Sequence, residues 1–188
     1  MANNCYNNIE IKGSEQEIKE FAKMLDLNDS QKNGCEVYAN LLNEFFGTFE
    51  QGYGDGNAKW FDLLTEEDTE DYGYLRISGD SAWNPSLTLF EKISERYPSF
   101  VIRYEYEESG VGFAGWADIE NGNLNDHCYD YWEGLVAMDE ENAIEQAITN
   151  ELECYDTEEE LIESDMYNAF NECLQAEILE AYRNEKQA

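Results

Sequence analysis

The stretch that decides the fold is residues 97–115, which read YPSFVIRYEYEESGVGFAG. Within it, residues 101–106 alternate between two faces and are rich in β-branched and aromatic types. Such alternation predicts a β-strand with one buried face. Gly110 and Gly112 then allow a reversal of the chain, and residues 113–120 predict a second strand. The centre of the protein is therefore predicted to be an antiparallel β-ribbon.

Two strand–helix pairs are predicted before this ribbon. Residues 5–12 alternate loosely, as a first strand would, and the capping-box pattern Ser14-x-x-Glu17 opens an amphipathic helix. Residues 74–77 predict a second strand. Asn84-Pro85 is typical of a helix start, with the asparagine as N-cap and the proline in the first helical position. After the ribbon, Asn121-Gly122 is favourable for a two-residue hairpin turn.

An insertion near residues 33–72 separates the two pairs. It contains a short helix or extended aromatic segment at residues 37–46, a glycine-rich loop at 51–57, a short apolar contact at 59–61 and an acidic connector at 65–71. Without the insertion the order is β, α, β, α, β, β. This order predicts an α+β fold of the ferredoxin-like, or split βαβ, type, in which both helices cover one face of an antiparallel sheet.

The last third of the chain is predicted to be mainly helical. Residues 123–136 are aromatic-rich and could add a strand, and residues 139–152 predict a helix with acids in its first turn. A second capping box, Thr157-x-x-Glu160, opens a long helix that runs to Tyr182, with one apolar stripe that docks. We therefore divide the chain into a ferredoxin-like domain, residues 1–136, and an acidic helical extension, residues 137–188, packed on it.

The formal net charge of −32 is the unusual feature of the composition. A small domain needs a net charge of only about 2 to 8 for solubility, and a larger excess destabilises the compact state by self-repulsion. Direct binding to nucleic acid or to anionic membranes is disfavoured, because their phosphates would repel the protein. Basic proteins or cations remain as partners. Adaptation to high salt is the alternative, and 30 Glu against 13 Asp fits it poorly.

Other bulk features indicate a folded intracellular domain. The chain is 42% hydrophobic and 14% aromatic, which argues against intrinsic disorder. No transmembrane helix is expected, because no run of about 18 apolar residues occurs. The first residues lack the basic start and apolar stretch of a signal peptide. Five widely spaced cysteines without a CxxC pair predict free thiols in a reducing cytoplasm.

Three segments carry a resemblance to a known family: GNAKWF (residues 56–61), SGDSAWNPS (78–86) and the YP…YEYEESGVGFAG stretch. Together with the opening MANNCYNNIEIKG, they make residues 1–122 similar to the ferredoxin-like domain of the Api-type and YubB-like proteins of phages and conjugative plasmids. The sequence departs from that family in Ser86, where a second proline is usual after Pro85, and in its more acidic surface. The resemblance implies the ferredoxin-like fold, a mobile-element origin and the cytoplasm of a bacterial host. It carries over no catalytic residues.

No catalytic site is predicted from the residues themselves. Glu105 and Glu107 share one strand face and could serve acid–base chemistry, but with 43 acids in the chain such pairs arise by chance. His127 is the single histidine and stands beside Cys128. A cysteine hydrolase needs the two groups together, whereas neighbours on a strand point to opposite faces. A hydrolase that uses both residues is left as a third hypothesis.

No cofactor or metal site is predicted either. Asp118-x-Glu120-x-Gly122 has a vague likeness to a calcium loop but lacks its ligand pattern, and the hairpin turn explains it better. Zinc-ligand spacing, a Walker loop and a GxSxG motif are absent from the sequence. The tryptophans are interpreted as core and sheet packing: Trp60, Trp83, Trp116 and Trp132.

The charge itself suggests a function. Duplex DNA offers one charge about every 3.4 Å along each strand, and carboxylates one helical turn apart are about 5–6 Å from each other. An acidic helix can therefore imitate a row of phosphates. A protein with such rows would be steered onto the basic groove of a nuclease, a repressor or an RNA-guided effector.

We therefore predict a non-enzymatic anti-defence inhibitor of the anti-CRISPR or antirestriction type. It would be an acidic nucleic-acid mimic that occupies the basic DNA- or RNA-binding site of a host defence protein. The expected partner is a basic nucleic-acid-binding protein or effector complex. The alternative is an adaptor or oligomerisation module that binds through its apolar stripe or aromatic patches. The simplest interpretation of the charge is an acidic surface that is only solvated and binds no partner. The predicted contact residues are Glu66, Glu67, Asp68, Glu70, Asp71, Glu105, Glu107, Glu108, Glu140, Glu141, Glu159, Glu160, Glu163, Asp165, Glu172 and Glu180.

Overall fold

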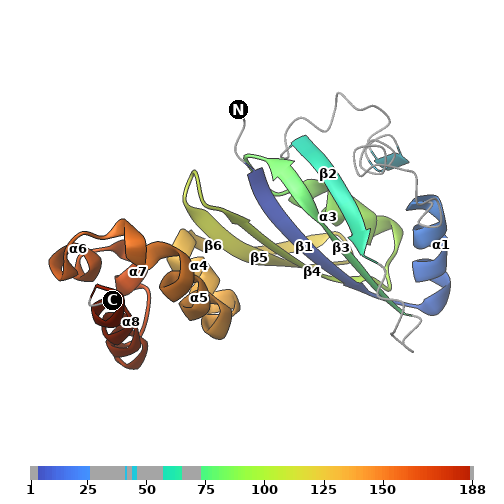
Figure 1. Ribbon diagram of the computed structural model, residues 1–188. Helices are drawn as coiled ribbons and strands as arrows, with labels where there is room; N and C mark the ends of the chain where they lie inside the picture. Colours follow the sequence, from blue (N-terminus) through green and yellow to red (C-terminus); the bar gives the residue numbers. More distant parts are fainter. Residues whose placement is uncertain (1–3, 26–40, 42–43, 46–56, 65–72, 187–188) are drawn as a thin grey trace. The chain divides into compact units, whose positions relative to one another are not determined.

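The computed structural model describes residues 4–25, 41, 44–45, 57–64 and 73–186 of the 188-residue chain (Figure 1). The chain divides into two compact units. The first, called the sheet unit, comprises residues 1–112 and 116–127. The second, called the helical unit, comprises residues 113–115 and 128–188. The division after residue 127 differs from the predicted boundary after residue 136, which lies two residues before the end of a helix.

A six-stranded sheet has the order β2-β3-β1-β4-β5-β6. β1 is antiparallel to both β3 and β4, and β2 is antiparallel to β3. Each βαβ crossover therefore leaves one strand between its two parallel strands, which is the split βαβ arrangement. The predicted ferredoxin-like α+β fold is confirmed. In chain order the elements are β1 (Asn4–Lys12), α1 (Glu15–Leu25), β2 (Asn57–Leu64), β3 (Tyr74–Ala82), α3 (Leu87–Arg96), β4 (Val101–Glu108), β5 (Phe113–Glu120) and β6 (Asn123–Asp130).

Two strands were not fully recognised in the sequence. β2 covers residues 57–64, where the sequence suggested the end of a loop and a short apolar contact. Its pairing with β3 shifts register between Ala58 and Trp60, and such a bulge breaks the alternation that marks a strand. β6 stops at Asp130, where a helix begins, so only part of residues 123–136 is a strand. The predicted helix at residues 37–46 and connector at 65–71 lie outside the described residues, apart from residues 41, 44 and 45.

The hairpin between β5 and β6 forms as predicted. Asn121 and Gly122 both have positive φ, 49° and 71°. This is the combination that a type I′ turn requires, and asparagine and glycine tolerate it best. The turn explains why β6 pairs with β5 although almost all of its residues are exposed.

α3 begins later than the sequence suggested. Its N-cap is Ser86, not Asn84, and the Ser86 side chain makes no capping hydrogen bond. The Ser86 backbone N–H instead donates to the Tyr104 hydroxyl at 3.0 Å. The first capping box is also only half formed: Ser14 Oγ accepts from the Glu17 N–H, but the Glu17 carboxylate accepts from Ser99 at 2.6 Å. Tertiary partners replace local caps at both helix starts.

The buried face of the sheet and the two helices enclose an aromatic core. Phe90 of α3 packs edge-on against Tyr104 of β4, with ring centroids 5.0 Å apart. Phe21 of α1 packs in the same way against Tyr97 and Phe100, each at 5.5 Å. α3 therefore packs on β4, and α1 packs on the connection between α3 and β4.

A buried polar cluster connects the strands to the start of α3. The Asn7 side chain, fully buried in β1, donates to the Cys5 carbonyl at 2.8 Å and to Ser81 Oγ at 3.0 Å. Its Oδ1 accepts from the Tyr104 hydroxyl at 3.0 Å. Ser81 Oγ in turn donates to the Asn84 carbonyl at 2.7 Å. Within the described residues no buried side-chain nitrogen or oxygen lacks a partner, so this cluster is fully satisfied.

The helical unit is built from short helices around its own apolar core. Five residues of the predicted apolar stripe are buried in that core: Leu161, Met166, Phe170, Ile178 and Tyr182. Two others, Ile162 and Cys173, are exposed. None of the helices in the described part of the chain is both long and apolar enough to cross a membrane. The elements are α4 (Tyr131–Met138), α5 (Glu140–Gln146), the π-turn Ala147–Glu151, a 3₁₀ turn Leu152–Cys154, α6 (Glu158–Ile162), α7 (Asp165–Asn168) and α8 (Glu172–Glu185).

The predicted long helix from Thr157 to Tyr182 is wrong, because the chain is recapped twice. The Ser164 hydroxyl accepts from the Tyr167 N–H at 3.2 Å and starts α7. The Asn171 side chain accepts from two N–H groups of the next turn and starts α8. Serine and asparagine compete with the helix for backbone groups in this way, and here they end one helix and open the next.

The Asn7 cluster gives a first prediction. Asn7→Ala should lower the free energy of unfolding by about 3 kcal/mol, because the carbonyls of Cys5 and Gly79 lose the amide donor that lies 2.8 and 3.1 Å away, and the Tyr104 hydroxyl loses its acceptor. Asn8→Ala is the matched control, since the Asn8 side chain is half-buried and bonds only to other side chains, Glu105 and Arg76. We expect the control to cost about 1 kcal/mol or less. Equal losses in urea unfolding would show that the cluster does not anchor the fold.

Gly134 of α4 gives a second prediction, for the helical unit. A Cβ at this position would lie 2.4 Å from the Ala114 carbonyl oxygen, which cannot move as a flexible side chain would. Gly134→Ala should therefore destabilise the unit by about 2 kcal/mol, although alanine is the better helix former by about 1 kcal/mol. Ala137→Gly, at an exposed site of the same helix, should lose only the propensity difference. A Gly134→Ala protein with a higher thermal midpoint would contradict the close contact.

Candidate functional site

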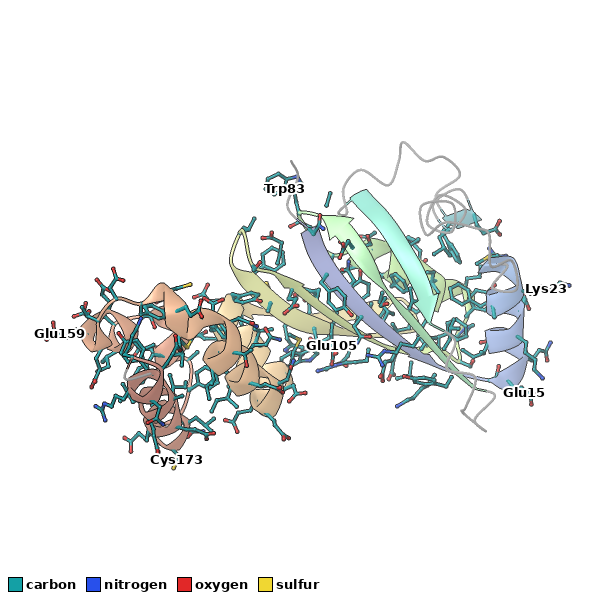
Figure 2. The ribbon with its side chains drawn as sticks, viewed as in Figure 1. Glu15, Lys23, Trp83, Glu105, Glu159 and Cys173 are labelled. Atoms are coloured by element: carbon teal, nitrogen blue, oxygen red, sulfur yellow. The ribbon has the colours of Figure 1, made fainter. Side chains whose placement is uncertain are left out.

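The predicted contact residues of the helical unit all lie on its surface. Each is exposed, and Figure 2 shows the labelled Glu159 at the surface of this unit. Residues 128–188 hold 18 acidic residues against two basic ones, Arg183 and Lys186. The surface of this unit is therefore strongly negative. The predicted residues found there are Glu140, Glu141, Glu159, Glu160, Glu163, Asp165, Glu172 and Glu180.

Most of these acids stand at the beginning of a helix. The first turns of α5, α6, α7 and α8 each contain at least one acidic residue. The N-terminus of a helix carries a partial positive charge, which stabilises a carboxylate there by roughly 0.3–1 kcal/mol. Breaking the chain into short helices thus creates several places where acids are tolerated. This arrangement offsets part of the self-repulsion that the net charge produces.

Some of the acids already have partners within the unit. Glu160 completes the second capping box, with its carboxylate accepting from the Thr157 N–H at 3.3 Å. Glu140 accepts from the Asn171 side chain at 3.0 Å. Glu158 is ion-paired with Arg183, which lowers the pKa of that carboxyl. Among residues 128–186 no other carboxylate has a cationic partner within 4 Å.

The remaining acids of the surface are available to an external cation. Glu159 lies in the first turn of α6, Glu163 is the C-cap of that helix one turn later, and Glu180 lies late in α8. Their carboxylates make no hydrogen bond or ion pair within the described residues. Because α6 and α8 are separate helices, these acids form several short groups and not the single row predicted from the sequence.

The three predicted acids of β4 have different environments. Glu105, labelled in Figure 2, accepts from Asn8 at 3.1 Å and lies 3.4 Å from Arg103 Nε. Glu108 is 2% exposed, and its carboxylate accepts from the N–H groups of Gly110 and Val111 in the following turn. Glu108 is therefore a turn-capping residue and does not lie on the acidic surface. The predicted residues Glu66, Glu67, Asp68, Glu70 and Asp71 lie outside the described residues.

Glu107 differs from both of its neighbours. It is half-buried, and within the described residues its carboxylate has neither a hydrogen bond nor an ion pair. Burial raises the pKa of the Glu107 carboxyl. A charge that is partly removed from water without a partner is unfavourable, so this position favours a proton or a cation.

His127 makes no hydrogen bond to Cys128 within the described residues. The His127 ring stacks on Trp116 of β5, with centroids 4.9 Å apart, and its Nε2 is hydrogen-bonded to Asn125 at 2.8 Å. The guanidinium of Arg103 contacts the same indole, 4.6 Å from the Trp116 ring centroid. His127 thus has a packing role, as the sequence suggested. In the part of the chain that the structure describes, no group of three or more potential ligands could hold a metal ion.

Trp83 was assigned to the core from the sequence, and this is wrong. Its side chain is 47% exposed, and its φ is +72°. Trp132 is half-buried on the core of the helical unit, with its ring 6.3 Å from that of Phe170, whereas nothing is described for the side chain of Trp60. A positive φ could not be predicted here from the sequence, because it is usual for glycine and asparagine and rare for tryptophan.

The environment of Glu107 gives a prediction for pH dependence. Because its pKa is raised in the folded state, the folded protein binds this proton more tightly than the unfolded chain does, and stability falls as pH rises through that folded pKa. Glu107→Gln should remove this loss, so the variant should be more stable than the parent at pH 7 but not at pH 4. Urea unfolding at both values measures the effect. A variant that is less stable than the parent at pH 7 would show that the carboxylate has a favourable partner.

Comparison with known families adds one finding. Residues 59–149 match the family model described as the ferredoxin-like domain in Api92-like protein. No curated protein and no solved structure matches the chain. The match begins in β2 and ends in the π-turn after α5, so it extends further toward the C-terminus than the predicted residues 1–122 and omits β1 and α1. It confirms the resemblance to Api-type proteins at the level of this ferredoxin-like domain.

Proposed function

We propose that the protein is an acidic nucleic-acid mimic that occupies the basic DNA- or RNA-binding site of another protein. The observation that carries this proposal is the surface of the helical unit, with 18 acidic residues against two basic ones in residues 128–188. A surface of one sign steers a partner of the opposite sign and speeds association. The fitting partner is a basic nucleic-acid-binding protein.

The arrangement of the acids supports a role outside the molecule. Glu159, Glu163 and Glu180 are exposed and make no ion pair within the described residues. Neighbouring carboxylates one turn apart are separated by about 5–6 Å, a spacing that lysine and arginine side chains arranged for phosphates can follow. Five residues of the predicted apolar stripe are buried in the core of the helical unit, which leaves less of the stripe for the binding surface of an adaptor.

The biological setting follows from the predicted resemblance. Api-type and YubB-like proteins of phages and conjugative plasmids suggest that this chain serves a mobile element. A mobile element gains from blocking the host proteins that bind and cut its nucleic acid. The target class is therefore a host defence protein, of the restriction or CRISPR type, and the action is occupation of its nucleic-acid site and not catalysis.

A competition experiment tests the proposal. The immobilised protein is exposed to bacterial lysate at near-physiological salt, and retained proteins are eluted at constant ionic strength with duplex DNA, with guide-like RNA or with polyglutamate. We expect duplex DNA or RNA to release a nucleic-acid-binding protein that polyglutamate leaves bound. Equal release by all three polyanions would show that the retained proteins are held by nonspecific charge attraction, and would contradict the proposal. A partner that survives high salt would indicate an adaptor.

The contribution of the helical unit is measured with a charge-matched pair of variants. Glu159→Gln, Glu163→Gln and Glu180→Gln together remove three charges from carboxylates that have no internal partner. We expect about a tenfold lower association rate constant for the eluted protein and a weaker salt dependence. Glu10→Gln, Glu20→Gln and Glu120→Gln together remove three charges from the sheet unit and should change the rate much less. Equal effects would mean that only net charge matters.

A further inference from the structure

β6 is an edge strand of the six-stranded sheet, and among the described strands it has only β5 as a neighbour. Seven of its eight residues are exposed. On its outer side an edge strand has a row of N–H and C=O groups that no other strand uses, and an extended chain can bind to this row as a further strand. β6 therefore offers main-chain groups, and not only side chains, to a partner.

The hairpin turn shows which groups of β6 point toward β5. A two-residue turn at Asn121-Gly122 makes Glu120 and Asn123 a hydrogen-bonded pair, and every second residue after Asn123 then also bonds to β5. This register places His127 directly opposite Trp116. The two rings stack with their centroids 4.9 Å apart, which agrees with the register.

The residues between these pairs direct their main-chain groups away from the sheet. They are Leu124 and Asp126, and both are exposed. Each has one N–H and one C=O on the outer side. Within the described residues none of these groups has a hydrogen-bonding partner. A bound strand could therefore make main-chain hydrogen bonds at both residues without disturbing the pairing of β6 with β5.

The other edge strand of the sheet, β2, is less suited to pairing. It contains Lys59, and its register with β3 shifts between Ala58 and Trp60. Lysine and a β-bulge are two features that keep an edge strand from pairing with another chain. β6 has neither lysine nor proline. Of the two edges, β6 is therefore the one at which a further strand fits.

The acidic residues of β6 indicate the charge of the strand that fits. The strand contains Asp126 and Asp130 and no lysine or arginine. The Asp126 carboxylate accepts from the Tyr106 hydroxyl at 2.6 Å, which fixes it next to the outward main-chain groups. Opposite charges on paired strands are favourable, whereas like charges are unfavourable. The edge thus disfavours a second copy of this chain, with its net charge of −32, and favours a basic strand.

We propose that the outer edge of β6 at residues 123–127, called the β6 edge, binds an extended segment of the partner that carries lysine or arginine at alternate positions. Main-chain hydrogen bonds would give affinity, and a basic side chain on the face of Asp126 would give selectivity. That the segment belongs to a nucleic-acid-binding protein rests on the proposed function. The strand pairing itself does not.

Amide hydrogen exchange with a model peptide tests the β6 edge directly. The probe is a lysine–threonine repeat of eight residues, added to the full chain. Its reference is the lysine–proline repeat of equal charge, because proline has no N–H and favours the polyproline II conformation. We expect the lysine–threonine peptide to slow exchange of the Leu124 and Asp126 N–H groups by about tenfold, as two main-chain hydrogen bonds would. The lysine–proline peptide should leave both rates unchanged.

Two variants at one position separate the main chain from the side chain. Leu124→Pro removes an outward N–H, and proline is tolerated on an edge strand. Leu124→Ala is the matched control, because it removes most of the same side chain and keeps the N–H. Calorimetric titration should show tighter binding of lysine–threonine than of lysine–proline peptide to the parent and to Leu124→Ala. We expect Leu124→Pro to lose this preference.

A charge variant tests the selectivity. Asp126→Asn keeps an oxygen that can accept from the Tyr106 hydroxyl and removes the charge. It should weaken the binding of the lysine–threonine peptide by about two- to fivefold. A glutamate–threonine repeat should leave exchange at Leu124 and Asp126 unchanged. If it slows exchange as the basic peptide does, the edge does not select by charge and the assignment of a basic segment is wrong.

The remaining outcomes separate this inference from the proposed function. Unchanged exchange at Leu124 and Asp126 with saturating lysine–threonine peptide would overturn the β6 edge as a binding site. A dimer of the free protein that Leu124→Pro dissociates would assign the edge to a second copy. Neither result would affect the elution of a partner by duplex DNA. Conversely, a lysate experiment without nucleic-acid-specific elution would refute the mimic, while pairing of a basic strand with β6 would stand.

Discussion

The sheet unit depends on the hydrogen bonds of the buried Asn7 side chain. One buried amide bonds to β1 itself, to Ser81 of β3 and to Tyr104 of β4. Through these two residues it also holds the turn that leads into α3. In a low-dielectric interior such a network is stable only when every member is satisfied. Its geometry therefore fixes three strands and one helix start together, which apolar packing alone would allow to shift.

The helical unit meets a different constraint, the repulsion among its acids. The unit consists of short helices, and the partial positive charge at their N-termini stabilises the acids found there. The same interruptions that shorten the helices, at Ser164 and Asn171, bring the apolar side chains into one core. The breaks between the helices thus both provide N-termini for the acids and allow the core to form. Most of the acids on the resulting surface have no ion-pair partner within the unit.

The proposed nucleic-acid mimicry would rest mainly on the helical unit. Long-range attraction needs only many exposed acids, which the helical unit has, and it weakens with salt. The sheet unit has two features of another kind. Trp83 has a backbone conformation of positive φ, which costs strain, and the Glu107 carboxylate is half-buried without a partner among the described residues. Both features are costly to the free protein, which a favourable contact in a complex would offset.

Local patterns in the sequence determined the ribbon of β4 and β5, the Asn121-Gly122 turn and the capping box at Thr157, because each depends on residues close in the chain. The ferredoxin-like order of the elements and the acidic character of the surface could also be predicted from the sequence. Only the tertiary structure decided that Glu17 bonds to Ser99 instead of completing its capping box, and that α3 starts at Ser86, beside the Tyr104 hydroxyl. The reason is that these contacts join partners distant in sequence, and a pattern of single residues carries no record of such pairs.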